Sequence, residues 1–370
     1  MRIFLLPIVA LLFVAPFAHA QELVSDTITT MRAKVVEVVS QETKQVPGLN
    51  VSATTQTIKI QILDGAEQGT TVTIANDYLV LKQGEVFYLR HDVNALDGTD
   101  YYYVYEPYRL GSLAILGALF IALVLFFGGK QGARGLLALG GSLFFIVFLL
   151  LPGILHGYPP VLVAMGVSSL IICLGSYITH GFNRTTSTAV FGMVLTIVIT
   201  GLLAYAAIPF TRLTGIANEE AVYLNLNAHG SIDLAGLLLG GMLIGVLGVL
   251  YDAAIGQAVA VEELTVAAPE LSRAHIYKRA LRIGREHIGA LVNTLAIAYV
   301  GAALPLLLLF FGYGTDTWST AINREIFATE IVRILIGSIG LVLAVPITTF
   351  ISVRMLVGKV SHSRHSGHHH

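Results

Sequence analysis

Residues 108–127 read YRLGSLAILGALFIALVLFF, and this stretch decides the class of the fold. Its one charged residue is Arg109, and a membrane-spanning helix needs about 20 mainly apolar residues. The whole chain agrees, since 55% of its 370 residues are hydrophobic, 12% are charged and the mean hydropathy is +0.75. Soluble domains carry about 25% charged residues. The sequence therefore predicts an α-helical polytopic membrane protein.

Further apolar stretches of this length follow, each bounded by charged residues, proline or glycine. We expect about seven transmembrane helices, at residues 108–127, 132–151, 160–179, 186–208, 232–251, 288–311 and 330–353. They make up a transmembrane domain at 107–353, and residues 354–370 form a tail. The histidines at the end of the tail fit divalent-metal binding and a purification tag equally, so they are set aside.

The residues before the first span differ in character. Residues 1–20 combine Arg2, an apolar run and a small-residue site ending at Ala20, which indicates a secretory signal peptide; an uncleaved signal anchor is the alternative. Residues 21–106 contain short β-branched and aromatic runs separated by turn residues. These predict an extracytoplasmic, all-β, OB-like domain, with strands at 31–40, 55–63, 70–74, 85–89 and 101–105.

Lysine and arginine are distributed unevenly between the expected loops. If the β-domain is outside, the inside loops carry most of them, and the longest inside loop contains Lys278, Arg279, Arg282 and Arg285. This agrees with the positive-inside rule and places the C-terminus in the cytoplasm. Their spacing indicates a helix that contacts anionic headgroups of the inner leaflet. A formal net charge of −1 gives no reason to expect nucleic-acid binding.

Polar residues in or beside the spans are candidates for a solute or ion pathway, because such groups are costly in hydrocarbon. Asp252 shares a helical face with glycines at 241, 245, 248 and 256, and this small-residue stripe favours a packing seam over a substrate path. Asp233 also suits a helix N-terminus. The full set of candidates is Asp233, Asp252, Glu262, Glu286, Asn293, Thr294, Tyr299 and Pro305.

The sixth span carries much of this polarity. Glu286, Asn293 and Thr294 fall on one helical face. Asn293 either coordinates an ion or substrate, or hydrogen-bonds to a neighbouring helix. Pro305 removes a backbone donor and predicts a local break in the helix.

Motifs typical of catalysis do not occur in the sequence. It contains no G-x-S-x-G, no H-E-x-x-H, no P-loop and no G-x-G-x-x-G after a strand. A single cysteine, Cys173, permits neither an intramolecular disulfide nor a cysteine metal cluster. We therefore expect no enzyme, no cofactor and no metal centre.

The sixth span resembles the YibE/F family of multi-pass membrane proteins. The resemblance rests on Gly284-Arg285-Glu286-His287-Ile288-Gly289, Asn293-Thr294-Leu295, Ala298-Tyr299-Val300-Gly301 and the run LPLLLLF at 304–310, with a further likeness at 240–252. It covers residues 30–350 and implies a protein of the bacterial inner membrane. It singles out Asp252, Asn293, Thr294, Tyr299 and Pro305 as motif positions, and it implies no substrate.

The spans, the polar sixth helix and Asp252 favour a transporter or exporter of a small solute or ion. The alternative is a non-transporting scaffold whose β-domain binds a protein partner outside the cell. An intramembrane enzyme ranks last, because no catalytic set occurs. The expected partners are the lipid bilayer, a small solute or ion, and a second copy of the chain.

Overall fold

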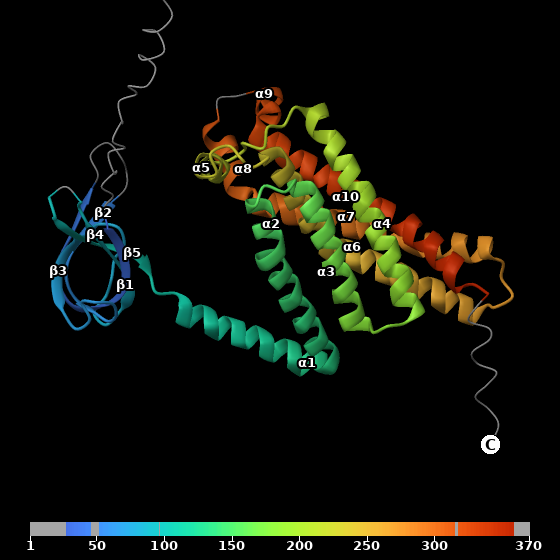
Figure 1. Ribbon diagram of the computed structural model, residues 1–370, viewed down its shortest axis with the longest axis horizontal. Coiled ribbons are helices and arrows are strands. Elements are labelled where there is room, and N and C mark those ends of the chain that lie inside the picture. Colours follow the sequence, from blue (N-terminus) through green and yellow to red (C-terminus); the bar gives the residue numbers. More distant parts are fainter. Residues whose placement is uncertain (1–26, 46–51, 96, 315–316, 359–370) are drawn as a thin grey trace, which may run out of the picture. The chain divides into compact units, whose positions relative to one another are not determined.

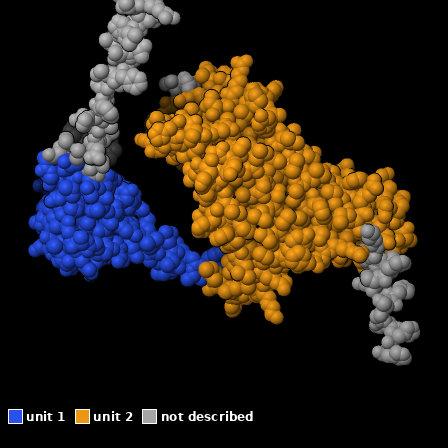
Figure 2. Space-filling model, viewed as in Figure 1, with its two compact units in different colours: residues 1–120 blue, residues 121–370 orange. Residues whose placement is uncertain are grey.

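The computed structural model describes residues 27–45, 52–95, 97–314 and 317–358. The predicted signal peptide and the terminal histidines lie outside the described residues. The chain divides into two compact units, residues 1–120 and 121–370 (Figure 2). The first contains the β-strands and the second is helical, so the predicted N-terminal β-domain and helical remainder are confirmed.

The β-domain is one antiparallel sheet with the strand order β3-β2-β1-β4-β5. Each predicted strand has a counterpart, and the strands are β1 (Thr27–Gln45), β2 (Ser52–Ile62), β3 (Thr71–Asn76), β4 (Val86–Val93) and β5 (Asp100–Pro107). β1 is the long central strand, because it pairs with both β2 and β4. The edge strands β3 and β5 contact each other, so the sheet curls into a half-barrel (Figure 1).

Alternation along the strands builds the β-domain core. Ile58, Ile60 and Ile62 of β2 are at most 1% exposed, while Lys59 and Gln61 between them point to solvent. Successive side chains of a strand point to opposite faces. The buried faces of β1 and β4 complete the core, chiefly through Ala33, Val35, Phe87 and Leu89.

The second unit is built from long helices joined by short segments. Those elements are α1 (Leu110–Phe145), the π-helical turn η2 (Ile146–Leu150), α2 (Leu151–Leu155), α3 (Pro160–His180), α4 (Arg184–Thr211), α5 (Glu219–Asn227), α6 (Leu234–Ala267), α7 (Arg273–Ala302), α8 (Leu304–Tyr313), α9 (Trp318–Asn323) and α10 (Glu325–Leu356).

Five helical stretches in the described part of the chain are long and apolar enough to cross a membrane. They are Leu110–Leu155, α3, α4, α6 and α10, and the bent pair of α7 and α8 makes a sixth if it counts as one span. The first stretch is interrupted at Gly129, whose φ of +52° and ψ of −134° are not helical. A Cβ atom on Gly132 would overlap the Val124 carbonyl, so the backbone passes close to itself there. The predicted spans 108–127 and 132–151 correspond to the two arms of this stretch.

Two helices extend beyond the predicted spans. α6 continues to Ala267 rather than ending near Tyr251, and α7 begins at Arg273 rather than near residue 288. A helix ends where its sequence offers a stop, not where the apolar stretch ends, and the first proline after Tyr251 is Pro269. The basic segment predicted to lie on the inner leaflet is therefore continuous with the sixth span. Its four basic side chains are exposed.

Close helix packing centres on α10, which contacts α4, α6 and α7. Its contacts with α4 are reciprocal: Gly192 faces Thr348, and Gly340 faces Thr200. Further along, the Ser352 hydroxyl donates to Thr188 Oγ1 at 3.0 Å. Residue numbers rise along α4 while those of their partners fall along α10, which shows that the two helices run antiparallel. Small residues at such positions let two backbones approach closely.

The predicted packing seam on α6 is formed only in part within the single chain, at Gly245, where a Cβ atom would overlap the Tyr299 hydroxyl of α7. A Cβ atom at Gly241, Gly248 or Gly256 would have no neighbour within 4 Å. A second close contact is made on another face, where Gly240 lies against Pro160 and Ala164 of α3. Helical periodicity identifies which residues share a face, but it does not say which face a neighbouring helix covers.

Candidate functional site

A cavity of about 660 Å³ lies among α2, α5, α6, α7, α8 and α10. We call it the Arg333 cavity. Its wall is mainly apolar, with Leu150, Leu234 and Leu306 among the lining side chains. The polar side chains that line it are Tyr299, Thr329, Glu330 and Arg333, together with the exposed Asn218 and Glu220. A mainly apolar cavity with a few convergent polar groups is the usual form of a small-molecule site.

An ion pair from α10 lies at the polar end of this cavity. Arg333 Nη2 is 3.4 Å from Glu330 Oε1, and each side chain is 28% exposed. The Arg333 guanidinium carbon also lies 5.6 Å from the centroid of the Tyr299 ring, within the range of a cation–π contact. Arg333 is therefore held between a carboxylate of its own helix and an aromatic ring of α7.

Several buried polar atoms at the cavity lack a hydrogen-bond partner among the described residues. They are the Tyr299 hydroxyl, Thr329 Oγ1 and Arg333 Nε. Thr329 is only 2% exposed. Leaving a buried donor or acceptor unpaired costs about 1–3 kcal/mol. Three such atoms belong to residues that line one cavity, although the atoms themselves are buried.

Local backbone features position Tyr299. α7 ends at Ala302, α8 begins at Leu304, and the two helices are bent by 62° at the break, with Pro305 in the first turn of α8. Across from the ring, Gly245 of α6 leaves room for the Tyr299 hydroxyl, which a Cβ atom there would overlap. The bend and the glycine together bring the phenol to the Arg333 cavity.

A carboxylate at the start of α10 holds the loop that contains Gly215, a residue of the cavity lining. Glu325 Oε1 accepts hydrogen bonds from the backbone N–H groups of Thr214 at 2.7 Å and Gly215 at 2.8 Å. Gly215 has a φ of +85°, and a Cβ atom on it would overlap the backbone of Leu234. Only glycine fits this position without strain. This loop is thus fixed against the starts of both α6 and α10.

A smaller cavity of about 220 Å³ adjoins the first and shares Tyr299 and Glu330 with it. Its other lining side chains are almost all apolar. The Phe310 ring lies 5.6 Å from Trp318 and 5.5 Å from Phe327, measured between ring centroids. We call this the aromatic cavity. It offers an apolar compartment directly beside the ion pair.

Of the pathway candidates predicted from the sequence, Tyr299 lines the Arg333 cavity. Asp233 caps α6 by accepting from the Gly236 N–H at 2.9 Å, as its helix-terminus interpretation expects. Glu262 is half-buried beside a separate cavity of about 290 Å³ that also contacts His180 and Asn183. The remaining candidates are exposed, namely Asp252, Glu286, Asn293, Thr294 and Pro305.

Sequence reasoning missed Glu330 and Arg333. Glu330 was assigned to the boundary of the last span, but α10 begins earlier, at Glu325, so both charges lie inside the helix. The available signal was an opposite-charge pair three residues apart within an apolar helix.

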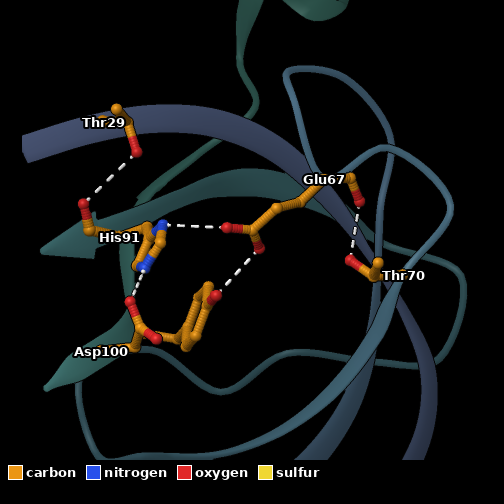
Figure 3. Close-up of polar contacts among 6 residues, drawn as sticks. Thr29, Glu67, Thr70, His91 and Asp100 are labelled. Atoms are coloured by element: carbon orange, nitrogen blue, oxygen red, sulfur yellow. Dashed lines mark hydrogen bonds and ion pairs between the residues drawn. The ribbon is translucent and has the colours of Figure 1, made fainter. Parts of the chain in front are cut away.

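The β-domain contains a second polar cluster, around His91 (Figure 3). His91 Nε2 lies 2.7 Å from Asp100 Oδ1, and Nδ1 lies 3.2 Å from Glu67 Oε1. The Tyr102 hydroxyl donates to Glu67 Oε2 at 2.8 Å, and its ring stacks on His91 at a centroid distance of 4.2 Å. Burial, followed by this hydrogen bond, raises the pKa of Tyr102 to about 12.

This His91 cluster links the turn that contains Glu67 to strands β4 and β5. In the described part of the chain, no group of three His, Cys, Asp or Glu side chains is placed to hold a metal ion. The contacts that the cluster makes join these three segments of the β-domain.

Comparison with known proteins bears on the helical region. No curated protein and no solved structure matches the chain. A family model described as YibE/F-like protein matches residues 116–358, which include every residue of both cavities. Because this match spans well over half of the chain, the protein belongs to the YibE/F-like family.

Proposed function

We propose that this protein carries a small solute or ion across the bacterial inner membrane, with the Arg333 cavity as its binding site. The observation that supports this is the cavity itself: Tyr299, Thr329 and Arg333 present unpartnered polar atoms between helices of membrane-spanning length. Intramembrane ionisable groups usually mark a substrate or ion path. The proposed activity is binding and release, with no chemical step.

The proposed arrangement in the membrane has seven spans. These are the two arms on either side of Gly129, then α3, α4, α6, the bent α7–α8 pair and α10. A bend in a transmembrane segment is compatible with the bilayer where it is buried in protein or lines a cavity, and the α7–α8 bend lies at both cavities. The OB-like β-domain would lie outside the cytoplasm, after a signal peptide, and the C-terminus inside.

Flux through the purified protein in proteoliposomes tests the function. Radiolabelled amino acids, organic acids and inorganic ions form the panel, and Arg333→Gln is compared with Arg354→Gln. Arg354 is an exposed arginine of the same helix that lies outside both cavities. We expect Arg333→Gln to reduce flux about tenfold or more, because an acceptor on the solute loses a charged hydrogen bond worth about 1.5–3 kcal/mol. Equal flux through both variants would place the pathway elsewhere.

A scaffold remains the second candidate, supported by the outer edge of the β-domain. Tyr101, Tyr103 and Tyr105 alternate along the edge strand β5 and are 52%, 36% and 46% exposed. An edge strand offers unpaired backbone groups to another chain. Co-purification of a protein that is lost in a triple Tyr→Ser variant, together with no flux of any panel member, would favour this function.

A second copy of the chain is the proposed cover for the exposed polar face of α6 and α7. Asp252 and Asn293 are both exposed there, and each would be costly in contact with lipid.

A further inference from the structure

We propose that the Arg333 cavity binds a small zwitterion with an apolar side group, of the class of an apolar amino acid. The ligand carboxylate contacts Arg333, its ammonium group contacts Glu330, and its side group enters the aromatic cavity. This inference rests on the proposed function and names the class of its solute.

The ion pair itself selects for two charges on the ligand. Arg333 Nη2 and Glu330 Oε1 are 3.4 Å apart, longer than the 2.7–3.2 Å typical of N–H···O hydrogen bonds. The two charges therefore attract each other without a close hydrogen bond, and both side chains line the cavity. A purely anionic ligand would engage Arg333 and leave Glu330 without its partner, and a cation would do the reverse. A mostly buried charge that loses its partner is strongly unfavourable, so a zwitterion is preferred.

The proposal places the ligand carboxylate beside three donors that are buried in this structure and turn toward it on binding. Arg333 Nε is a donor, and the hydroxyls of Tyr299 and Thr329 both have a proton to donate. All three belong to residues that line the same cavity. A carboxylate has about four lone-pair sites and can accept from several donors at once. Glu330, which is acceptor-only when ionised, is the carboxylate paired with Arg333, and the proposal assigns the ammonium group to it.

The aromatic cavity accounts for the apolar side group. It shares Tyr299, Ala303, Leu306 and Glu330 with the Arg333 cavity, and the proposal has the side group of the ligand pass between these residues. The aromatic cavity has a volume of about 220 Å³. Phe310, Trp318 and Phe327 line it, and few polar atoms face it. Burial of an apolar group there is favourable by about 25 cal/mol per Å² of surface removed from water.

Binding to the purified full-length protein in detergent tests the proposal, by calorimetry and by ligand-induced thermal stabilisation. The probes are leucine, methionine and phenylalanine, each compared with its amide, which lacks the carboxylate. Isocaproate lacks the amine of leucine, and free glycine lacks the side group. We expect at least one of the three amino acids to bind. Its amide, isocaproate and glycine should each bind with an affinity lower by about tenfold or more. Binding of none of the three, or equal binding of isocaproate and leucine, would overturn the proposal.

Two variants assign the charges. In Arg333→Gln, the bound amino acid and its amide should bind equally, and in Glu330→Gln, leucine and isocaproate should bind equally. A change in selectivity is not produced by a loss of stability alone. The matched controls Arg354→Gln and Glu263→Gln, at exposed positions outside both cavities, should retain the wild-type selectivity. Wild-type selectivity in Arg333→Gln or Glu330→Gln would contradict the assignment.

Binding and flux separate this inference from the proposed function. A zwitterion that binds without being transported would leave the site assignment intact and contradict the transport function. Transport of a solute that carries a single charge, with no binding of amino acids, would support the transport function and contradict the zwitterion site.

Discussion

The phenol of Tyr102 lies on the His91 ring and donates its proton to Glu67. Its pKa of about 12 means that the folded β-domain keeps the phenol neutral after an unfolded chain, with an ordinary tyrosine pKa of about 10, has lost the proton. The stability that Tyr102 contributes is therefore fully present below pH 10 and is lost as the pH rises toward 12.

Ultraviolet titration of tyrosinate in the wild type and in Tyr102→Phe checks this shift. The difference between the two curves should stay flat through pH 10 and rise only near pH 12. Tyr78→Phe, which removes a tyrosine that is 63% exposed and outside the His91 cluster, is the control. A Tyr102 difference curve with its midpoint at pH 10 would show that the phenol is neither buried nor bonded to Glu67.

Residues of the candidate site differ in how far they can be predicted. Tyr299 and Pro305 carry a local signal, a polar ring and a helix breaker within an apolar run, and both lie at or beside the cavity. Arg333 carries a local signal as well, its i,i+3 pairing with Glu330, but its contact with the Tyr299 ring of α7 is not specified by any local pattern. Asp252 and Asn293 carry the same signal as Tyr299, yet neither lines the Arg333 cavity. Intramembrane polarity identifies candidate residues, but tertiary packing decides which of them meet.

At the scale of the elements, the reciprocal contacts of Gly192 and Gly340 hold α4 against α10. Gly192→Leu places a side chain where Thr348 already lies. We expect this overpacking to cost about 1–3 kcal/mol of stability. It should appear as a lower unfolding temperature of the purified protein in detergent.

Gly248→Leu is the matched control, because a Cβ atom there meets nothing within 4 Å in the chain. Its unfolding temperature should equal that of the wild type in the monomer. If it destabilises the protein only in an oligomer-containing fraction, a second copy covers this face of α6. Equal loss in monomeric Gly192→Leu and Gly248→Leu would contradict the α4–α10 packing described here.

Most elements follow from local patterns, and their lengths do not. Alternation of apolar and polar residues predicts strand β2, because it requires only that one face of the strand is buried. The identity of the element that covers this face does not matter. The ends of α6 and α7 are harder to predict, since helix propagation past an apolar stretch leaves no mark in hydropathy. The glycine stripe on α6 predicts only part of its packing, because Gly245 of the stripe meets Tyr299 of α7, while Gly240, outside the stripe, faces α3.

For the whole molecule, the proposed topology places the β-domain and the start of α7 on opposite sides of the membrane. Single cysteines at Asp77→Cys and Lys278→Cys, in a Cys173→Ser background, test this with a membrane-impermeant thiol reagent. Both native side chains are exposed. The cysteine at 77 should react in intact cells, and the cysteine at 278 only after lysis. The reverse pattern of reactivity would invert the topology.

The first arm of α1 consists mainly of exposed apolar side chains. Between Leu110 and Gly128 every side chain except that of Val124 is exposed, and no residue of α1 is buried. In the proposed membrane arrangement, lipid is the solvent of this arm. Natural selection would then preserve the hydrophobicity and length of this arm. The order of its leucine, isoleucine, alanine and phenylalanine residues would be free to vary.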